Sequence, residues 1–277
     1  MQTNRLNRRA FVTATAATSA IAVGLFATSA PATFAAQSAT PIPVTPLGFA
    51  STRLRTLTSA SARDQVTAAV LSDFADQVKP LAGYEGYILG DVIDDPTKQV
   101  AITVLQNADQ ADAFNTTAAT FVASVADLVD ANATVTWAGD VLIDAGPSAA
   151  PAATPAASPA ATPLPAATPI VTNSEGYLAV RIHTSKPDTD PRDIIPQIIS
   201  GFLPIVTGLP GFKGYLWYPI DGGFVAISLY DSVASANASN AAAQDWAVAN
   251  VSDYTDGNPQ IINANVVYVD LPIIPGL

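Results

Sequence analysis

An internal repeat constrains the fold of this chain more than any other feature of its sequence. With a shift of 128 positions, segment 83–87 (GYEGY) aligns with segment 211–215 (GFKGY) without a gap. After a turn that is shorter in the second copy, a shift of 125 positions aligns 100–102 (VAI) with 225–227 (VAI). Glycines, aromatic residues and apolar runs in the same order indicate one domain written twice. Further matched pairs are Gly48 with Gly176, Arg53 with Arg181, Phe74 with Phe202, Asn115 with Asn240, and Phe121 with Trp246.

Each copy carries the pattern strand, helix, strand, strand, helix, strand. Alternating or apolar runs predict strands, and apolar residues spaced about four apart predict packed helices. Pro204 falls inside the first helix of the second copy, where we expect it to kink or shorten that helix. The order βαββαβ predicts the α+β class with two ferredoxin-like repeats, each an antiparallel sheet with two helices on one face. The expected first strands are 49–57 and 177–184, the second helices 108–126 and 233–250, and the last strands 134–144 and 261–270.

Two stretches of the second copy carry a family resemblance: GFKGY at 211–215, then GGFVAIS at 222–228, followed by an Ala/Asn-rich helix through Trp246. In this pattern and order, the chain resembles the dimeric α/β-barrel superfamily, and within it the antibiotic-biosynthesis-monooxygenase-like group. The resemblance implies that two sheets close face to face into a barrel. Because both copies lie in one chain, we expect an intramolecular barrel and a monomer.

Composition divides the rest of the chain. Residues 146–170 are rich in Pro and Ala and carry no charge, which is typical of a semi-rigid linker. Residues 37–47 form a shorter, flexible Pro-containing lead-in. The expected repeats are therefore 48–145 and 171–277.

Residues 1–36 have the features of an export signal. The pair Arg8-Arg9 precedes an apolar stretch of small residues, and this arrangement resembles the twin-arginine motif. We expect cleavage between Ala32 and Ala36 and a secreted, periplasmic or cell-surface protein; retention of the segment as a membrane anchor is the alternative.

Charge and cysteine content exclude several classes of function. A net charge of −11 argues against a nucleic-acid partner. The absence of cysteine excludes disulfides, thiolate nucleophiles and Cys-ligated metals. We expect no metal, no cofactor and, after signal cleavage, no membrane association.

The candidate ligand-binding residues are Arg53, Arg55, Arg181 and His183. Strand alternation places Leu178, Val180 and Ile182 on one face of the sheet and Tyr177, Ala179, Arg181 and His183 on the other. We expect the apolar set to meet the helices. The Arg and His side chains would then point into the space between the two sheets.

These residues allow more than one interpretation. The arginines either recognise an anionic ligand or pair with buried acids such as Glu85, Asp140 or Asp144. His183 is a candidate base or a haem or metal ligand, and otherwise an ordinary hydrogen-bonded strand residue. Aromatic residues that could line a pocket are Tyr87, Trp137, Tyr215, Trp217 and Trp246.

Catalytic motifs are absent from the sequence: it contains no phosphate-binding loop, nucleophile elbow or zinc-protease motif. The catalytic residues, if any, are therefore unknown. The sequence favours a non-catalytic small-molecule-binding or scaffold protein whose barrel cavity takes a small anionic or aromatic ligand. The alternative is a cofactor-independent monooxygenase-like or isomerase-like enzyme that uses the same cavity.

Overall fold

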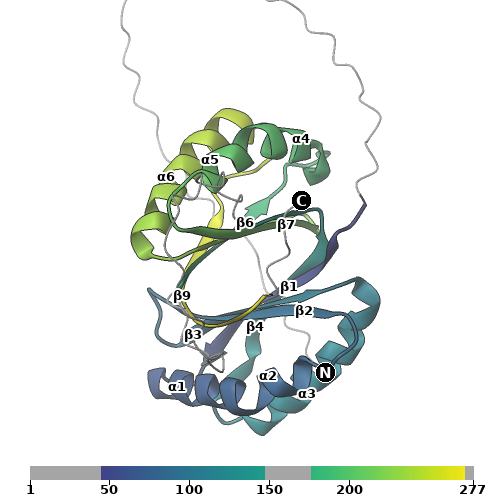
Figure 1. Cartoon of the computed structure of the whole chain (residues 1–277), viewed down its shortest axis with the longest axis vertical. Helices are drawn as coiled ribbons and strands as arrows, with labels where there is room; N and C mark the ends of the chain where they lie inside the picture. The colour runs from purple at the N-terminus through teal and green to yellow at the C-terminus, as the bar shows by residue number, and fades with distance from the viewer. Residues whose placement is uncertain (1–44, 147–175, 272–277) are drawn as a thin grey trace, which may run out of the picture. The chain divides into compact units, whose positions relative to one another are not determined.

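The computed structural model describes residues 45–146 and 176–271 (Figure 1). The expected signal segment, most of the lead-in and nearly all of the linker lie outside the described residues. Two halves of the described chain each show the element order that the sequence predicted.

The first half begins with a strand and a long helical segment. Its elements are β1 (Gly48–Leu57), α1 (Ala60–Ala69), a π-helical turn η1 (Val70–Phe74), α2 (Ala75–Val78), β2 (Tyr84–Val92), β3 (Lys98–Leu105), a short 3-10 turn η2 (Ala108–Gln110), α3 (Ala111–Ser124), β4 (Val129–Val141) and β5 (Ile143–Ala145).

The second half repeats this order. Its elements are β6 (Gly176–Thr184), a 3-10 turn η3 (Pro191–Ile194), α4 (Ile195–Gln197), a π-helical turn η4 (Ile198–Phe202), α5 (Leu203–Thr207), β7 (Phe212–Ile220), β8 (Gly223–Tyr230), α6 (Val233–Asn250) and β9 (Gln260–Asp270). The predicted βαββαβ order is confirmed in both halves.

Local sequence explains where the helices begin. The Ser59 hydroxyl accepts a hydrogen bond from the backbone N–H of Ala62 at 3.1 Å and caps α1. The Ser232 hydroxyl accepts from the N–H of Ser235 at 3.2 Å and caps α6. Each cap satisfies one of the backbone donors that a helix start leaves free.

The expected shortening at Pro204 does not occur. The helical segment of the second half continues to Thr207, which is equivalent to Lys79, just past the end of α2 in the first half. Pro204 stands at the start of α5, directly after the π turn η4, and the first half has the same wide turn without a proline. Both halves therefore share the π-helical turn, and Pro204 does not cause it. Pro204 lies at a position where its missing N–H donor is tolerated.

One nine-stranded sheet contains all the strands, in the order β4-β1-β3-β2-β9-β6-β8-β7-β5. Strand β9 pairs with β6 through its first residues and with β2 through its last, where Tyr87 lies opposite Asp270. Strand β4 pairs with β1, and its continuation β5 pairs with β7, where Asp144 lies opposite Leu216. Because β4 and β5 are consecutive in the chain, they close the sheet into a barrel within one polypeptide.

Buried side chains form three clusters in the described part of the chain. One lies between the strands and helices of the first half, and a second lies in the same layer of the second half. The third fills the barrel interior with residues from the strands and their connections, among them Ile102, Leu178 and Ile227. In Figure 1, α1, α2 and α3 cover one side of the first half's strands, and α4, α5 and α6 cover one side of the second half's strands.

The expected orientation of the first strand of each repeat was wrong. Leu178 and Val180 belong to the barrel interior, whereas Tyr177 and Ala179 pack in the layer beneath the helices. Arg181 shares the face of Tyr177 and Ala179, so it also points toward the helices. Both faces of this sheet are buried, and alternation groups residues by face without saying which face is covered by helices.

No helix in the described ranges is both long enough and apolar enough to cross a membrane.

Candidate functional site

A cavity of about 780 Å³ lies in the second half between the strands and the helical layer. Strands β6, β7, β8 and β9 contribute Arg181, His183, Tyr215, Trp217, Phe224, Ala226, Ile261 and Asn263 to its wall. The helical side contributes Ile194, Ile198, Phe202, Asn240, Ala243, Gln244, Trp246, Ala247, Val248 and Val251. Lys186, Ser252 and residues 255–259 complete the wall. The exposed side chains of Val248 and Ile261 lie at its edge.

Strand register explains why this space exists. Across the four strands, Trp217 lies opposite Ala226, Ala226 opposite Arg181, and Arg181 opposite Ile261. The methyl group of Ala226 leaves room between the two large side chains on either side of it. The barrel interior, where a cavity was expected, is instead filled with apolar side chains.

Arg181 is buried in this wall, with 6% of its surface exposed. Its Nη1 donates to Ser228 Oγ at 3.1 Å, and its Nη2 donates to Asn240 Oδ1 of α6. Neither partner carries a charge. Burial lowers the pKa of Arg181 from its ordinary value, and nearby tyrosines oppose that shift.

The expected acid partners of the arginines lie elsewhere. Among the described residues, the ion pairs with carboxylates involve other cations and neither Arg53 nor Arg181. Asp144 is on β5, where burial and then the nearby Glu85 charge raise its pKa to about 6. Of the two interpretations of Arg53 and Arg181, pairing with buried acids such as Glu85, Asp140 or Asp144 is therefore wrong within the described residues.

His183 lies next to Arg181 on the same face. Its ring stacks on Phe224, with the ring centroids 4.4 Å apart and an interplanar angle of 13°. Burial, and then the Arg181 charge, lower the pKa of His183 to about 4, so the imidazole is neutral near pH 7. No hydrogen bond joins the ring to another described residue, which leaves a neutral donor and acceptor beside the cavity.

Two further polar groups in the cavity wall have no hydrogen-bond partner among the described residues. They are Nε1 of Trp217, which is fully buried, and Oδ1 of Asn263. A buried N–H without an acceptor lowers the stability of the folded protein. A ligand that supplies an acceptor removes this cost and therefore binds more tightly. Trp217, Tyr215 and Trp246 were expected pocket aromatics, whereas Asn263 had no signal in the sequence.

The first half uses its equivalent residues differently. Arg53 Nη2 donates to Asn115 Oδ1 at 2.6 Å, and its guanidinium lies 5.7 Å from the centroid of Phe114. Arg55 is 3% exposed in the same layer. The four candidate residues therefore lie in two separate helix–sheet layers and do not share one cavity.

Ring packing accounts for the difference between the halves. Phe114 and Phe121 pack against Phe74 in the first half, and all three are buried. The residue equivalent to Phe114 is Ser239, which accepts a hydrogen bond from Tyr230. Loss of one phenyl ring helps to open the second half's layer. The repeat pairing of Asn115 with Asn240 was the sequence signal for the two Arg–Asn contacts, and it was missed.

Within residues 45–146 and 176–271, no group of three or more His, Asp or Glu side chains is placed to hold a metal ion. Of the expected pocket aromatics, Tyr87 packs in the first half's layer and Trp137 packs against the barrel interior.

Comparisons with known proteins identify the fold. No family model and no curated protein matches the sequence. A candidate monooxygenase from Fusobacterium nucleatum superposes with a TM-score of 0.61 at 12% identity, over 84% of this chain and 97% of its own. A candidate monooxygenase from Lactobacillus acidophilus gives 0.57 at 8% identity, over 81% and 96%. An anthrone oxidase-like protein gives 0.55 at 12% identity, over 83% and 95%. The likeness at these identities establishes architecture alone: this chain has the dimeric α/β-barrel fold, built within a single polypeptide.

Proposed function

We propose that this protein binds a small organic anion with a flat, apolar body in the helix–sheet cavity of its second half, without transforming it. The observation that carries the proposal is the buried Arg181 guanidinium at the wall of an open cavity, whose hydrogen-bond partners among the described residues are both neutral. A buried cation is normally matched by an anion. A ligand carboxylate, phenolate or enolate would provide that charge.

The cavity walls favour an aromatic or similarly flat ligand. Trp217, Phe224 and His183 form one continuous wall of rings, because Trp217 and His183 each pack against Phe224. Phe202 and Trp246 pack against each other on the helical side. A volume of about 780 Å³ lies within the range of sites for drug-sized molecules.

The polar groups lie where they can orient such a ligand. Arg181 offers a guanidinium for a charged oxygen, and Trp217 Nε1 offers a second donor on the same strand row. Two donors next to an aromatic wall select a flat molecule with oxygen atoms at one end.

Ligand retention and titration test this proposal. Native mass spectrometry of the exported protein should reveal a bound small organic acid. Titration of ligand-free protein with aromatic carboxylates should change the fluorescence of Trp217 and Trp246. Arg181→Gln should weaken binding at least about tenfold, the effect of losing one charge-assisted hydrogen bond.

A matched control removes an equal charge outside the cavity. Arg192 lies at the start of η3 with 57% of its side chain exposed and pairs with Asp190. Arg192→Gln should bind as the unmodified protein does. Equal loss of affinity in both variants, or no loss in Arg181→Gln, contradicts the proposal.

A second candidate function is catalysis, and His183 favours it. Its neutral imidazole beside the cavity can accept a proton from a ligand C–H or O–H, and Arg181 would stabilise the resulting anion. Return of the proton at another carbon would make the protein an isomerase. Transfer of electrons from the anion to O₂ would form a C–O bond and a peroxide, and loss of water from that peroxide, with cleavage of its O–O bond, would leave a carbonyl group; this would make the protein a monooxygenase with O₂ as the oxidant.

Deuterium exchange separates catalysis from binding. An enzyme that abstracts a ligand proton should incorporate solvent deuterium into the ligand, and His183→Gln should abolish the exchange without abolishing binding. Exchange at the uncatalysed rate in the unmodified protein leaves binding alone as the function.

We also propose that the protein is exported by the twin-arginine route and acts as a monomer outside the cytoplasm. Arg8-Arg9 and the apolar stretch that follows support the route. The sheet that closes within one chain supports the monomer, because each half already covers the sheet face of the other.

A further inference from the structure

The helix–sheet layer of the first half contains an unusual concentration of unpaired polar atoms. Five buried side-chain atoms there have no hydrogen-bond partner among the described residues: Ser51 Oγ, Arg55 Nη1, Tyr87 OH, Gln99 Oε1 and Thr103 Oγ1. Folded proteins leave few such atoms unpaired, and a cluster indicates a missing partner.

Strand register places all five on one face of three neighbouring strands. Tyr87 lies opposite Thr103, and Thr103 lies opposite Ser51. On the same face of β3, the small Ala101 lies between Thr103 and Gln99. Gln99 lies opposite Arg55 of β1. This is the face covered by the helices, because Tyr87 and Ala101 pack in the cluster beneath them.

The charges on this face are not balanced. Arg55 is 3% exposed, its Nη1 has no hydrogen-bond partner, and none of the ion pairs among the described residues involves it. Burial raises the pKa of Tyr87, and the positive charges of Arg55 and Arg53 and the direct approach of the Arg55 side chain act in the opposite direction, so both guanidinium groups lie near this hydroxyl. Burial, and then the Arg55 charge, lower the pKa of Arg53.

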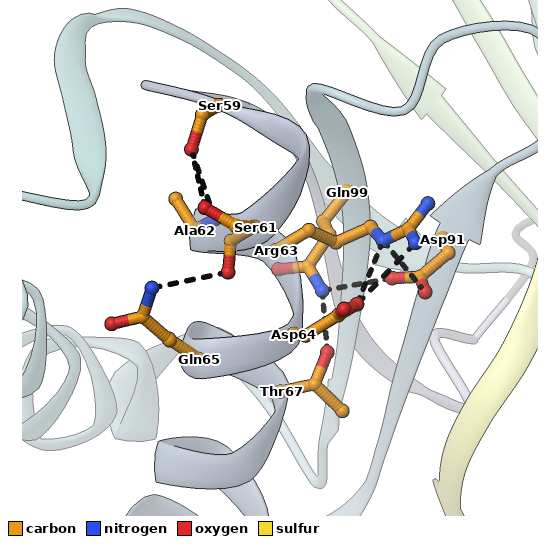
Figure 2. Close-up of polar contacts among 9 residues, drawn as sticks. All are labelled: Ser59, Ser61, Ala62, Arg63, Asp64, Gln65, Thr67, Asp91 and Gln99. Atoms are coloured by element: carbon orange, nitrogen blue, oxygen red, sulfur yellow. Dashed lines mark hydrogen bonds and ion pairs between the residues drawn. The ribbon is translucent and has the colours of Figure 1, made fainter.

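The acid on this face is already in use. Figure 2 shows Asp91 held by Arg63, with Arg63 Nε 3.3 Å from Asp91 Oδ2. Gln99 Nε2 donates to Asp91 Oδ1 at 2.9 Å and to Thr67 Oγ1 at 2.8 Å. Arg55 therefore lacks a carboxylate, and water could satisfy the hydroxyl groups without balancing this charge.

We propose that the first half holds a small inorganic anion, of the size of a halide, between the Arg55 guanidinium and the Tyr87 hydroxyl. The Arg55 N–H and the Tyr87 O–H donate to the anion, and Arg53 adds a second positive charge nearby. The ligand has to be small, because Val66, Val70 and Phe74 of the covering helix are each fully buried. The site differs in location, residues and ligand from the cavity of the second half.

Bromide tests the site in the unmodified protein. Crystals of the mature chain grown in sodium bromide should give an anomalous peak beside Arg55 and Tyr87. Peaks at exposed lysines and arginines only would show adventitious ions and overturn the proposal, as would the absence of any peak in the first half's helix–sheet layer.

Thermal unfolding at constant ionic strength gives an independent test. Raising chloride from about 5 mM to about 200 mM, in exchange for an anion too large to enter, should raise the Tm by about 2–5 °C if chloride binds only the folded state. Arg55→Met should lose this response.

The matched control is Lys98→Met. Lys98 lies at the start of β3 and pairs with Asp95 at 2.9 Å, with 39% of its side chain exposed. The Lys98→Met variant should keep the full increase of Tm with chloride. Equal responses in Arg55→Met and the unmodified protein would overturn the proposal, and if Arg55→Met does not fold, the bromide peak decides.

Discussion

The hydroxyl of Tyr218 donates a hydrogen bond to Oγ1 of Thr52 at 2.6 Å, although the two residues lie 166 positions apart in the chain. Tyr218 comes from β7 of the second half and Thr52 from β1 of the first, and both are fully buried. The apolar barrel interior surrounds Tyr218. A hydrogen bond in such surroundings selects one packing of the two halves, because any other packing leaves both groups unpaired.

Removing this hydrogen bond should weaken the whole barrel. We expect Tyr218→Phe to lower the free energy of unfolding by about 1–3 kcal/mol, because Thr52 Oγ1 then has no donor. Urea denaturation of Tyr218→Phe, Thr52→Val and the double variant measures the coupling. The double variant should lose less than the sum of the single losses, by about 0.5–3 kcal/mol. Simple additivity would show that the two groups act independently.

Cutting the linker should not separate the halves. Residue Pro155 lies outside the described part of the chain, and a protease site inserted next to it allows cleavage of the protein. The β2–β9 and β5–β7 ladders and the shared interior should hold the fragments together during size-exclusion chromatography. Two fragments that elute as separate, folded species would contradict an intramolecular barrel.

Arg181 should contribute to ligand binding and not to stability. Its partners Ser228 and Asn240 are neutral, so replacing it by a long apolar side chain leaves no orphaned carboxylate, and removal of a buried unpaired charge offsets the loss of a donor to these two acceptors. We expect the free energy of unfolding of Arg181→Met to lie within about 1 kcal/mol of that of the unmodified protein, or above it. Differential scanning calorimetry measures this in the ligand-free state. A loss of about 3–5 kcal/mol would instead indicate a buried acid partner.

Asp144 should make the protein less stable as the pH rises. Its pKa is about 6 in the folded protein against an ordinary value of 3.8, so the folded state holds a proton that the unfolded state releases between these values. Its contribution to stability is therefore full below about pH 4 and is lost as the pH rises to about 6. Asp144→Asn should be more stable than the unmodified protein at pH 7 and similar near pH 4.

His183 has the opposite pH dependence, which sets the control for this measurement. Its pKa is about 4 in the folded protein against 6.5, so its contribution is lost as the pH falls from about 6.5 to about 4. The Asp144→Asn comparison should therefore be repeated with His183→Gln present in both proteins. Identical pH profiles with and without Asp144 would exclude the raised pKa.

Export should depend on the arginine pair. We expect Arg8-Arg9 changed to Lys-Lys to leave unprocessed precursor in the cytoplasm, because the resemblance to the twin-arginine signal rests on that pair. Immunoblotting of cell fractions measures precursor and processed protein. Normal export and trimming of the double variant would mean that a different route is used.

Closure of the barrel within one chain was expected from the resemblance to the dimeric α/β-barrel superfamily, whereas the sequence by itself predicted two similar halves and their βαββαβ order. Glycines and aromatic residues recur at a fixed shift, and helix and strand periodicities differ, so these features can be recognised without tertiary contacts. Even the Arg–Asn contacts had a sequence signal, since Asn115 and Asn240 are equivalent under the repeat.

Only the tertiary structure decided which way each strand faces. Alternation correctly separated Leu178 and Val180 from Arg181, but both faces of the sheet are buried, so hydrophobicity could not say which face meets the helices. The barrel interior is filled largely by apolar strand side chains, so no helix offers Arg181 a hydrogen-bond acceptor there. Beneath α6 it meets Asn240. Because these arginines point toward the helices of their own halves, Arg53 and Arg181 lie apart. The cavity lies beneath the helices of the second half for the same reason.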